Sequence, residues 1–234
     1  MPSNAISMNT NPWFLHVPGL LSGPLLAQVR QAMETSSFVD GRSTAGGAAA
    51  LVKLNLQMAD SPMKQQLDQL LLQAIMSVPD VHKAFFPTKV YGLIYAKYGP
   101  EMTYGWHLDS PIMMSHQPVR TDIAMTIFIS DPETYEGGEL EVQAPGAQSS
   151  WKLPAGDAIF YPATTVHRVA PVTRGERRVV VTWIQSAVRE PRHRQVLYEL
   201  KLAHEQMEAV PELKDAAEKV QHAFSHLLRE WAEI

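Results

Sequence analysis

The feature that most constrains the fold is a series of short apolar segments between turn residues, from Lys89 to Gln185. These segments are rich in β-branched and aromatic residues, which favour strands over helices. The predicted strands are 90–95, 123–129, 140–143, 151–153, 158–161, 166–169 and 177–184. Short strands at this spacing predict an antiparallel sandwich or barrel, and they exclude regular alternation of strands and helices.

The flanks of this region have helical patterns. Ser22-Gly-Pro and Ser61-Pro62 each place a capping residue and a proline where helices start, so a helix is expected after each. Between them, 41–50 is rich in Gly and Ala and is expected to be a loop, either a mobile lid or a long connection. Apolar residues at three- and four-residue steps near the C-terminus predict a helical hairpin packed on the core or on a partner.

The chain therefore divides into three predicted parts. Residues 1–87 form a helical flank, 88–187 the strand-rich domain, and 188–234 a C-terminal helical extension. Neither a basic, signal-like N-terminus nor an apolar run of about 20 residues occurs, so a cytoplasmic protein without a membrane span is expected. The net charge of −4 gives no reason to expect a nucleic-acid partner.

The absence of cysteine limits the possible metal sites. It excludes disulfides, thiolate nucleophiles, iron–sulfur clusters and Cys-ligated zinc. Any bound metal must therefore be held by His, Asp or Glu, and the chain has nine His.

A candidate metal site comes from two separated motifs. His107 and Asp109 are two residues apart, so on an extended backbone both side chains point to one face. His167 follows Asp109 by 58 residues on a predicted strand, which is enough chain for it to return beside the first motif in a closed sheet. Two His and one carboxylate are typical of non-haem Fe(II) oxygenases, because they leave open positions on the metal. The sequence thus predicts an Fe(II) site.

Arg177 lies ten residues after His167, on the next predicted strand. A guanidinium can hold a carboxylate by two parallel hydrogen bonds, so Arg177 is expected to anchor the far carboxylate of a co-substrate that chelates the metal. The neighbouring Arg178 should point to the opposite face, because side chains alternate along a strand.

With these motifs in place, the chain resembles a known family. The matching blocks are Tyr98-Gly-Pro-Glu-Met-Thr-Tyr-Gly-Trp-His-Leu-Asp, Tyr135-Glu-Gly-Gly-Glu-Leu, Pro154-Ala-Gly-Asp-Ala-Ile-Phe-Tyr-Pro, His167-Arg-Val-Ala-Pro-Val-Thr-Arg-Gly-Glu-Arg and Trp183-Ile-Gln-Ser. Together they resemble the PKHD-type hydroxylases of the Fe(II)/2-oxoglutarate-dependent dioxygenase (prolyl 4-hydroxylase-like) superfamily.

This resemblance implies a mainly β protein with a double-stranded β-helix (jelly-roll) core and flanking helices. His107, Asp109 and His167 match the family's iron ligands, and Arg177 matches its 2-oxoglutarate anchor. Tyr98 matches an aromatic position near the co-substrate, for which Tyr95 is a competitor. The implied reaction consumes dioxygen and 2-oxoglutarate, hydroxylates a substrate and releases succinate and carbon dioxide, often with L-ascorbate as accessory reductant.

Several alternatives stay open at this stage. A non-catalytic, cupin-like module that binds a metal or a small ligand is the second functional hypothesis. The substrate is open between a protein residue, an amino acid and a metabolite, and 41–50 and 110–119 are the expected specificity segments. His222 and His226 are expected to be solvated histidines on a helix, and the C-terminal helices are candidates for a homodimer interface.

Overall fold

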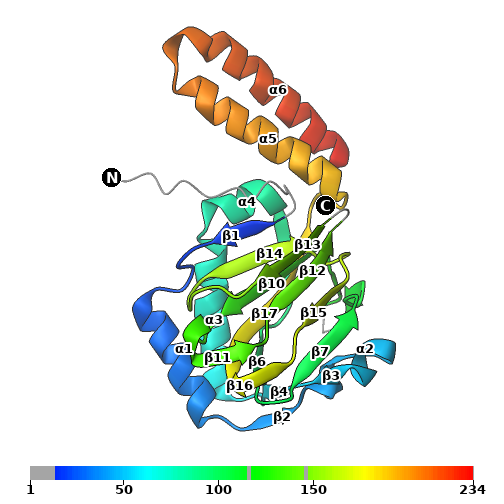
Figure 1. Ribbon diagram of the computed structural model, residues 1–234. Coiled ribbons are helices and arrows are strands. Elements are labelled where there is room, and N and C mark those ends of the chain that lie inside the picture. The colour runs from blue at the N-terminus through cyan, green and yellow to red at the C-terminus, as the bar shows by residue number, and fades with distance from the viewer. Residues whose placement is uncertain (1–13, 115–116, 145–146, 234) are drawn as a thin grey trace.

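The computed structural model describes residues 14–114, 117–144 and 147–233. Two antiparallel sheets face each other in a jelly-roll core (Figure 1). The larger, 8-stranded sheet has the order β1 (Leu15–Val17), β14 (Ala158–Pro162), β10 (Ile123–Phe128), β17 (Arg177–Ser186), β6 (Ile94–Tyr98), β4 (Leu56–Met58) and β2 (Phe38–Asp40), with β5 (Pro87–Val90) also paired to β17. The 5-stranded sheet has the order β13 (Ala147–Trp151), β12 (Leu140–Ala144), β15 (His167–Val169), β7 (Thr103–His107) and β3 (Lys53–Leu54). The predicted mainly β fold is confirmed.

Two short ladders complete the strand set. β11 (Tyr135–Gly137) pairs with β16 (Val172–Gly175), and β8 (Ile112–Met113) pairs with β9 (Val119–Arg120). The second ladder falls largely within the segment 110–119, which was expected to be a loop and a candidate for specificity.

The larger sheet separates two apolar cores, because successive side chains of a strand point to opposite faces. On β6, Tyr95 packs into the outer core against the helices, whereas Ala96 and Tyr98 face the inner core between the sheets. The outer core is covered by α1 (Gly23–Thr35), α3 (Pro62–Met76) and α4 (Pro79–Phe85). Burial on both faces fixes the register of this sheet, since a slip by one residue would exchange its two faces.

The N-terminal helices begin as expected, but the connection between them differs from the prediction. Pro24 and Pro62 lie in the first turns of α1 and α3, and the Ser61 hydroxyl accepts a hydrogen bond from the Lys64 amide. The expected loop at 41–50 is wrong: it forms the 3₁₀ helix η1 (Gly41–Thr44) and the single-turn helix α2 (Gly47–Leu51). The single-turn helix α2 is held against β7, because the Gly105 amide of β7 donates to the carbonyl of Val52, the residue directly after α2.

Four strands were not predicted in the part of the chain expected to be a helical flank. β1, β2, β3 and β4 are two or three residues long, too short to show a period of two. Their partners also lie far away in the sequence, as in the β1–β14 and β3–β7 pairs. Their hydrogen bonds make the N-terminal segment a structural part of both sheets.

The predicted C-terminal hairpin is confirmed. α5 (Pro191–Glu208) and α6 (Lys214–Trp231) pack against each other and extend beyond the sheets (Figure 1). Near the core, Lys83 of α4 pairs with Glu205 at 2.9 Å, and a bridge joins Val188 to Ala232. The remaining short helices are η2 (Pro132–Thr134) and η3 (Pro211–Leu213).

Two expectations attached to these helices have different outcomes. Among the described residues, none of the helices combines the length and the apolar character needed to cross a membrane. The contacts of the single chain give no support to the homodimer expected through the hairpin.

Candidate metal centre and co-substrate pocket

The smaller sheet brings the two predicted histidines together. His107, the last residue of β7, lies directly opposite His167, the first residue of β15. Their ring centroids are 4.3 Å apart. Asp109 follows β7 by two residues, so the chain places its carboxylate beside both rings.

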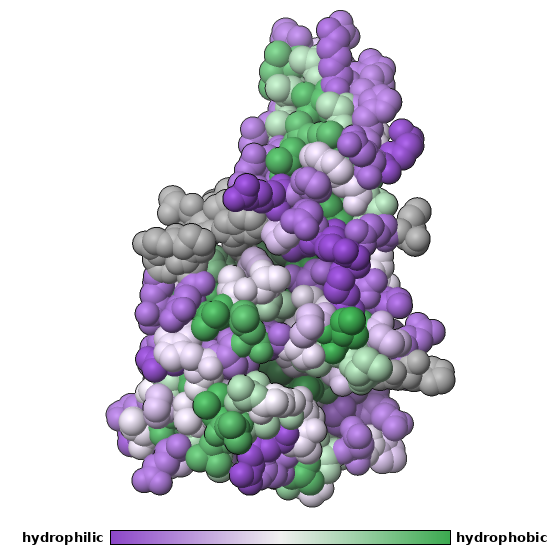
Figure 2. All heavy atoms as spheres, turned by 90° about the vertical axis from the view of Figure 1, so that its right-hand side faces the viewer, coloured by the Kyte–Doolittle hydropathy of each residue, from purple (hydrophilic) through white to green (hydrophobic). Residues whose placement is uncertain are grey.

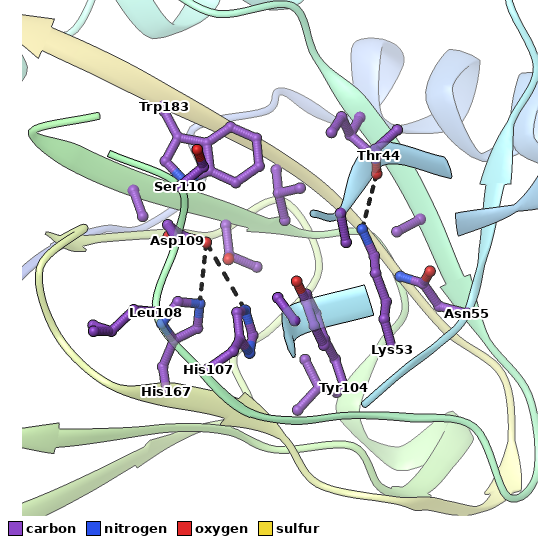
Figure 3. A pocket seen from close by; sticks show the side chains of 18 of the residues that line it. Thr44, Lys53, Asn55, Tyr104, His107, Leu108, Asp109, Ser110, His167 and Trp183 are labelled. Atoms are coloured by element: carbon purple, nitrogen blue, oxygen red, sulfur yellow. Dashed lines mark hydrogen bonds and ion pairs between the residues drawn. The ribbon is translucent and has the colours of Figure 1, made fainter. Parts of the chain in front are cut away.

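The three side chains form a compact donor set (Figure 3). Asp109 Oδ1 lies 3.9 Å from His107 Nε2 and 3.7 Å from His167 Nε2, and one donor atom from each residue lies within 4.8 Å of the others. All three side chains are nearly fully buried. Among the described residues, this is the one group of three or more His, Asp or Glu close enough to share a metal ion.

The hydrogen bonds around the rings prepare them for a metal. His107 Nδ1 lies 2.7 Å from the Gly105 carbonyl and His167 Nδ1 lies 3.0 Å from the Thr165 carbonyl. With Nδ1 protonated, each ring donates to its carbonyl and directs the Nε2 lone pair toward Asp109. Burial, together with the nearby His167, lowers the pKa of His107 to about 3, so its ring is neutral at physiological pH.

The Asp109 carboxylate has the surroundings of a metal ligand. Asp109 Oδ2 is buried and has no hydrogen-bond partner among the described residues. A buried carboxylate oxygen without a donor is costly unless a cation binds it. Two imidazoles and one such carboxylate fit Fe(II) and leave further positions on the metal open.

Arg177, the first residue of β17, enters the same cavity from the larger sheet. Its side chain is 1% exposed and makes no ion pair with any residue of the described chain. Its Nε and Nη1 atoms are buried without hydrogen-bond acceptors. The guanidinium lies 5.1 Å from the centre of the Tyr98 ring. A buried, unpaired guanidinium requires an anion, and the bidentate fork of arginine suits a carboxylate.

Two other basic residues near Arg177 lie outside the cavity. Arg178 points to the opposite face of β17, where it contacts Glu176 at 2.6 Å and Glu34 at 3.2 Å. Lys97 pairs with Glu176 at 3.7 Å and lies over the Phe38 ring, outside the cavity. The alternation of side chains along β17 therefore separates Arg177 from Arg178 as the sequence predicts.

The choice between the two tyrosines follows from the faces of β6. Tyr98 is buried at the cavity wall, where burial raises its pKa and the adjacent Arg177 opposes that rise. Tyr95 lies on the other face of the strand, with Lys64 5.7 Å from its ring centre. Only Tyr98 of this pair reaches the cavity.

The Gly137-Gly138 pair explains how the large Arg177 side chain is accommodated. Both glycines have the positive φ expected of a turn, +70° and +69°. A Cβ at Gly138 would lie 2.9 Å from Arg177 Cδ and 2.9 Å from Val172 Cγ2. Gly138 thus serves both the turn and the space that Arg177 needs.

A single cavity of about 480 Å³ contains the donor triad, Arg177 and Tyr98. Two tyrosines that the sequence did not single out support the histidines. The Tyr104 ring stacks on His107 with centroids 3.5 Å apart, and the Tyr161 ring meets His167 edge-on at 5.3 Å. Tyr104 lies within the matching Tyr98–Asp109 block, but a period of two places residues 104 and 107 on opposite faces. The register shift between β7 and β15 brings the two rings together, and the sequence does not show it.

The opposite wall of the cavity comes from the N-terminal segment. η1 and α2 contribute to the lining, and so do Lys53, Asn55 and Gln57 of β3, β4 and the residue between them. Sequence reasoning missed these three residues, because no local pattern accompanies them. By contrast, His222 and His226 are exposed on α6, as expected, and lie outside the cavity.

Comparison with known sequences identifies a shared family. A family model described as the 2OG-Fe(II) oxygenase superfamily matches residues 93–185. A PKHD-type hydroxylase of Synechococcus sp. (strain JA-2-3B'a(2-13)) is 37% identical over 222 residues, covering 94% of this chain and 99% of the relative. A PKHD-type hydroxylase of Paracoccus denitrificans is 38% identical over 222 residues, covering 93% and 98%.

Solved structures show the same fold at low sequence identity. A Trichoplax adhaerens prolyl hydroxylase has a TM-score of 0.59 and 12% identity, over 80% of this chain and 88% of that protein. A Pseudomonas putida prolyl-4-hydroxylase has a TM-score of 0.56 and 16% identity, over 75% and 94%. HygX from Streptomyces hygroscopicus, solved with nickel and 2-oxoglutarate bound, has a TM-score of 0.53 and 15% identity, over 80% and 88%.

Proposed function

This chain belongs to the PKHD-type hydroxylases of the 2OG-Fe(II) oxygenase superfamily, and from that premise we propose which of its residues carry the reaction. It is an Fe(II)- and 2-oxoglutarate-dependent dioxygenase. We propose that it hydroxylates a C–H bond of its substrate and releases succinate and carbon dioxide. The observation that carries the assignment of residues is the donor triad and the unpaired Arg177 in one cavity.

His107, Asp109 and His167 are proposed as the protein ligands of Fe(II). The two Nε2 atoms supply nitrogen ligands, and the Asp109 carboxylate supplies an anionic oxygen. When bound, the iron supplies the oxidative chemistry with dioxygen and 2-oxoglutarate, and the protein positions the reactants. The backbone carbonyls of Gly105 and Thr165 keep both rings oriented during turnover.

Arg177 and Tyr98 are proposed to hold 2-oxoglutarate. Arg177 would bind the carboxylate that is remote from the metal through N–H groups of its guanidinium, in which Nε and Nη1 have no acceptor among the described residues. Tyr98 is buried beside the guanidinium and limits where that carboxylate can lie. The surrounding apolar side chains, among them Phe128, keep water away from the ion pair, which strengthens it.

The alternative of a non-catalytic, cupin-like module is not favoured. The relatives are named hydroxylases, and Arg177 would have no role in such a module. L-Ascorbate is retained as an accessory reductant to be included in assays.

The direct test is anaerobic addition of Fe(II) and 2-oxoglutarate to the purified protein. A weak visible charge-transfer band is expected, because the keto acid chelates a ferrous ion. Admission of air should then produce succinate slowly without any substrate. If neither the band nor succinate appears in metal-loaded, folded protein, the proposed function is wrong.

A further inference from the structure

A second cation, Lys53, enters the cavity from β3, the strand next to β7 in the smaller sheet, across the Tyr104 ring from the metal site. It lies in the two-residue strand β3, paired with Tyr104 of β7, and it is 7% exposed. Its Nζ donates to Thr44 Oγ1 at 2.9 Å and lies 5.0 Å from the centre of the Tyr104 ring (Figure 3). Within the described chain, no carboxylate forms an ion pair with it. One of its three N–H donors is thus used, and by a neutral acceptor.

Neutral polar groups surround this ammonium. Asn55 and Gln57 are buried and line the cavity with Lys53, and the Gln57 amide contacts Thr44 Oγ1 at 2.9 Å. Asn55 Oδ1 has no partner among the described residues. A Cβ at Gly41 would lie 1.8 Å from that oxygen, so the glycine makes room for the Asn55 side chain. The wall is therefore a packed polar site with one uncompensated positive charge.

The charge balance of the loaded site leaves Lys53 without a counter-ion. This step rests on the proposed function. The two positive charges of Fe(II) and the one of Arg177 are cancelled by Asp109 and by the dianionic 2-oxoglutarate. Asp40, the other carboxylate near Lys53, is engaged by Arg42. One positive charge therefore remains for the substrate to neutralise, which matches a monoanion.

The surface around the opening is apolar. Figure 2 shows a hollow with hydrophobic side chains around it, on the face that carries α2, β3 and β7. Exposed apolar residues from the segments that line the cavity include Leu51, Leu108 and Met114, which are 87%, 52% and 74% exposed. Apolar groups gathered beside a cavity favour an apolar portion of a ligand.

We propose that Lys53, with Thr44, binds a carboxylate of the substrate, and that the substrate is a monocarboxylate with an apolar chain. The carboxylate would accept hydrogen bonds from the two free N–H groups of Lys53, and the apolar chain would contact the rim of the opening. Burial lowers the pKa of Lys53 to about 8, which still leaves the ammonium charged at neutral pH.

The test is calorimetric titration of anaerobic protein loaded with Fe(II) and saturating 2-oxoglutarate. The probes are straight-chain monocarboxylates of about four to ten carbons and their primary amides, which match them in shape without the charge. The wild-type protein is expected to bind carboxylates at least about tenfold more tightly than amides, with affinity rising along the series. Lys53→Met should abolish the preference and leave amide binding unchanged.

Further variants guard against a folding artefact. Thr44→Val, which removes the hydroxyl that positions Nζ, should reduce the preference severalfold. Lys97→Met removes a lysine outside the cavity and should retain the full preference. Thermal unfolding of each variant establishes that it is folded.

Two results with the wild type would overturn the proposal: equal binding of carboxylates and amides, or no binding of either. Two results with Lys53→Met would do the same. These are a preference for carboxylates that survives the change, or a loss of 2-oxoglutarate affinity as large as in Arg177→Met. A protein that shows the charge-transfer band but lacks the preference refutes the substrate proposal alone. A folded, metal-loaded protein that gives neither the band nor succinate refutes the proposed function, and this inference with it.

Discussion

The two ends of the cavity are built in different ways. At the metal end, His107, His167 and Arg177 lie on strands of the two sheets and inside the region that matches the family model. At the opposite end, Lys53 lies on a strand of two residues, and Thr44 closes a 3₁₀ helix of four. Paired strands of the two sheets therefore hold the groups proposed for the chemistry, with a register shift beside His167, whereas shorter elements present the groups proposed for the substrate.

This difference separates the parts of the protein that can change independently. A shift of β7 or β15 would break the donor triad, because both histidines lie in one register pair. A changed residue in η1, α2 or β3 would alter the wall while the triad stays in place. Specificity can therefore vary on a constant oxygenase core, as expected when function lies in a site more than in a fold.

The largest effect on metal binding is expected for Asp109→Ala. This change removes the one anionic group of the proposed ligand set, so Fe(II) affinity should fall by about two orders of magnitude or more, and the charge-transfer band should disappear. Metal titration under anaerobic conditions measures the effect. The matched control is Asp60→Ala, because that carboxylate is 93% exposed and pairs only with Lys64. Retention of wild-type iron affinity in Asp109→Ala would refute the ligand assignment.

The next largest effect is expected for Arg177→Met. The co-substrate loses its charged partner, so 2-oxoglutarate affinity should fall by about 2–4 kcal/mol, or roughly 30- to 1000-fold. Titration of the charge-transfer band gives the dissociation constant. Arg178→Met is the natural control, since Arg178 points outward to Glu176 and Glu34. Equal losses in the two variants would show that general charge, not a placed guanidinium, attracts the co-substrate.

The metal end was also the part that the sequence could predict. Its residues obey local rules: side chains alternate along a strand, and a ligand pair two residues apart shares a face. Those rules selected His107 with Asp109 and placed Arg177 and Arg178 on opposite faces, and the ten-residue spacing from His167 favoured Arg177. They could not decide between Tyr95 and Tyr98, because the sequence does not tell which face of β6 meets the second sheet. The structure answers this question, because the helices pack against the face of β6 that carries Tyr95.

The opposite wall could not be predicted, for a physical reason. Lys53 reaches the cavity because β3 pairs with Tyr104, whose position is distant in the sequence. A two-residue strand has no detectable period, and a lone lysine has no partner motif. Likewise, the small residues of 41–50 indicated a loop, and only the contact of Val52 with β7 makes α2 a helical turn.

A smaller effect on the metal end is expected from Gly138→Ala. The new methyl group would meet Arg177 Cδ and Val172 Cγ2 at 2.9 Å, and the backbone has a φ of +69°. Overpacking and strain should lower the free energy of unfolding by about 1–3 kcal/mol and should displace the guanidinium. Weaker 2-oxoglutarate binding should accompany this loss. Gly92→Ala, where a Cβ meets nothing within 4 Å, should change neither quantity.

The smallest expected effect concerns Lys53. It tests whether this buried lysine lowers the stability of the folded protein, as expected if it is present for binding. Burial lowers the pKa of Lys53 from 10.5 to about 8, so the folded protein holds this ammonium unfavourably. Lys53→Met should therefore raise the free energy of unfolding at pH 7, by about 3 kcal/mol at most. Lys97→Met should instead lower it slightly, since Lys97 contacts Glu176 and the Phe38 ring.

The lowered pKa of Lys53 also predicts how the stability difference between wild type and Lys53→Met changes with pH. Below pH 8 both folded and unfolded chains carry the Lys53 proton, so the full penalty is present. Between pH 8 and 10.5 the folded chain has released the proton that the unfolded chain still binds, so wild-type stability rises relative to Lys53→Met.

The groups that act on Lys53 are Asp109, Asp40 and His107, with Tyr104 beside it, and all four are retained in the variant. Chemical denaturation of both proteins across this range measures the difference. If Lys53→Met is less stable than wild type at pH 7, the lysine supports the fold, and its burial need not be explained by a substrate anion.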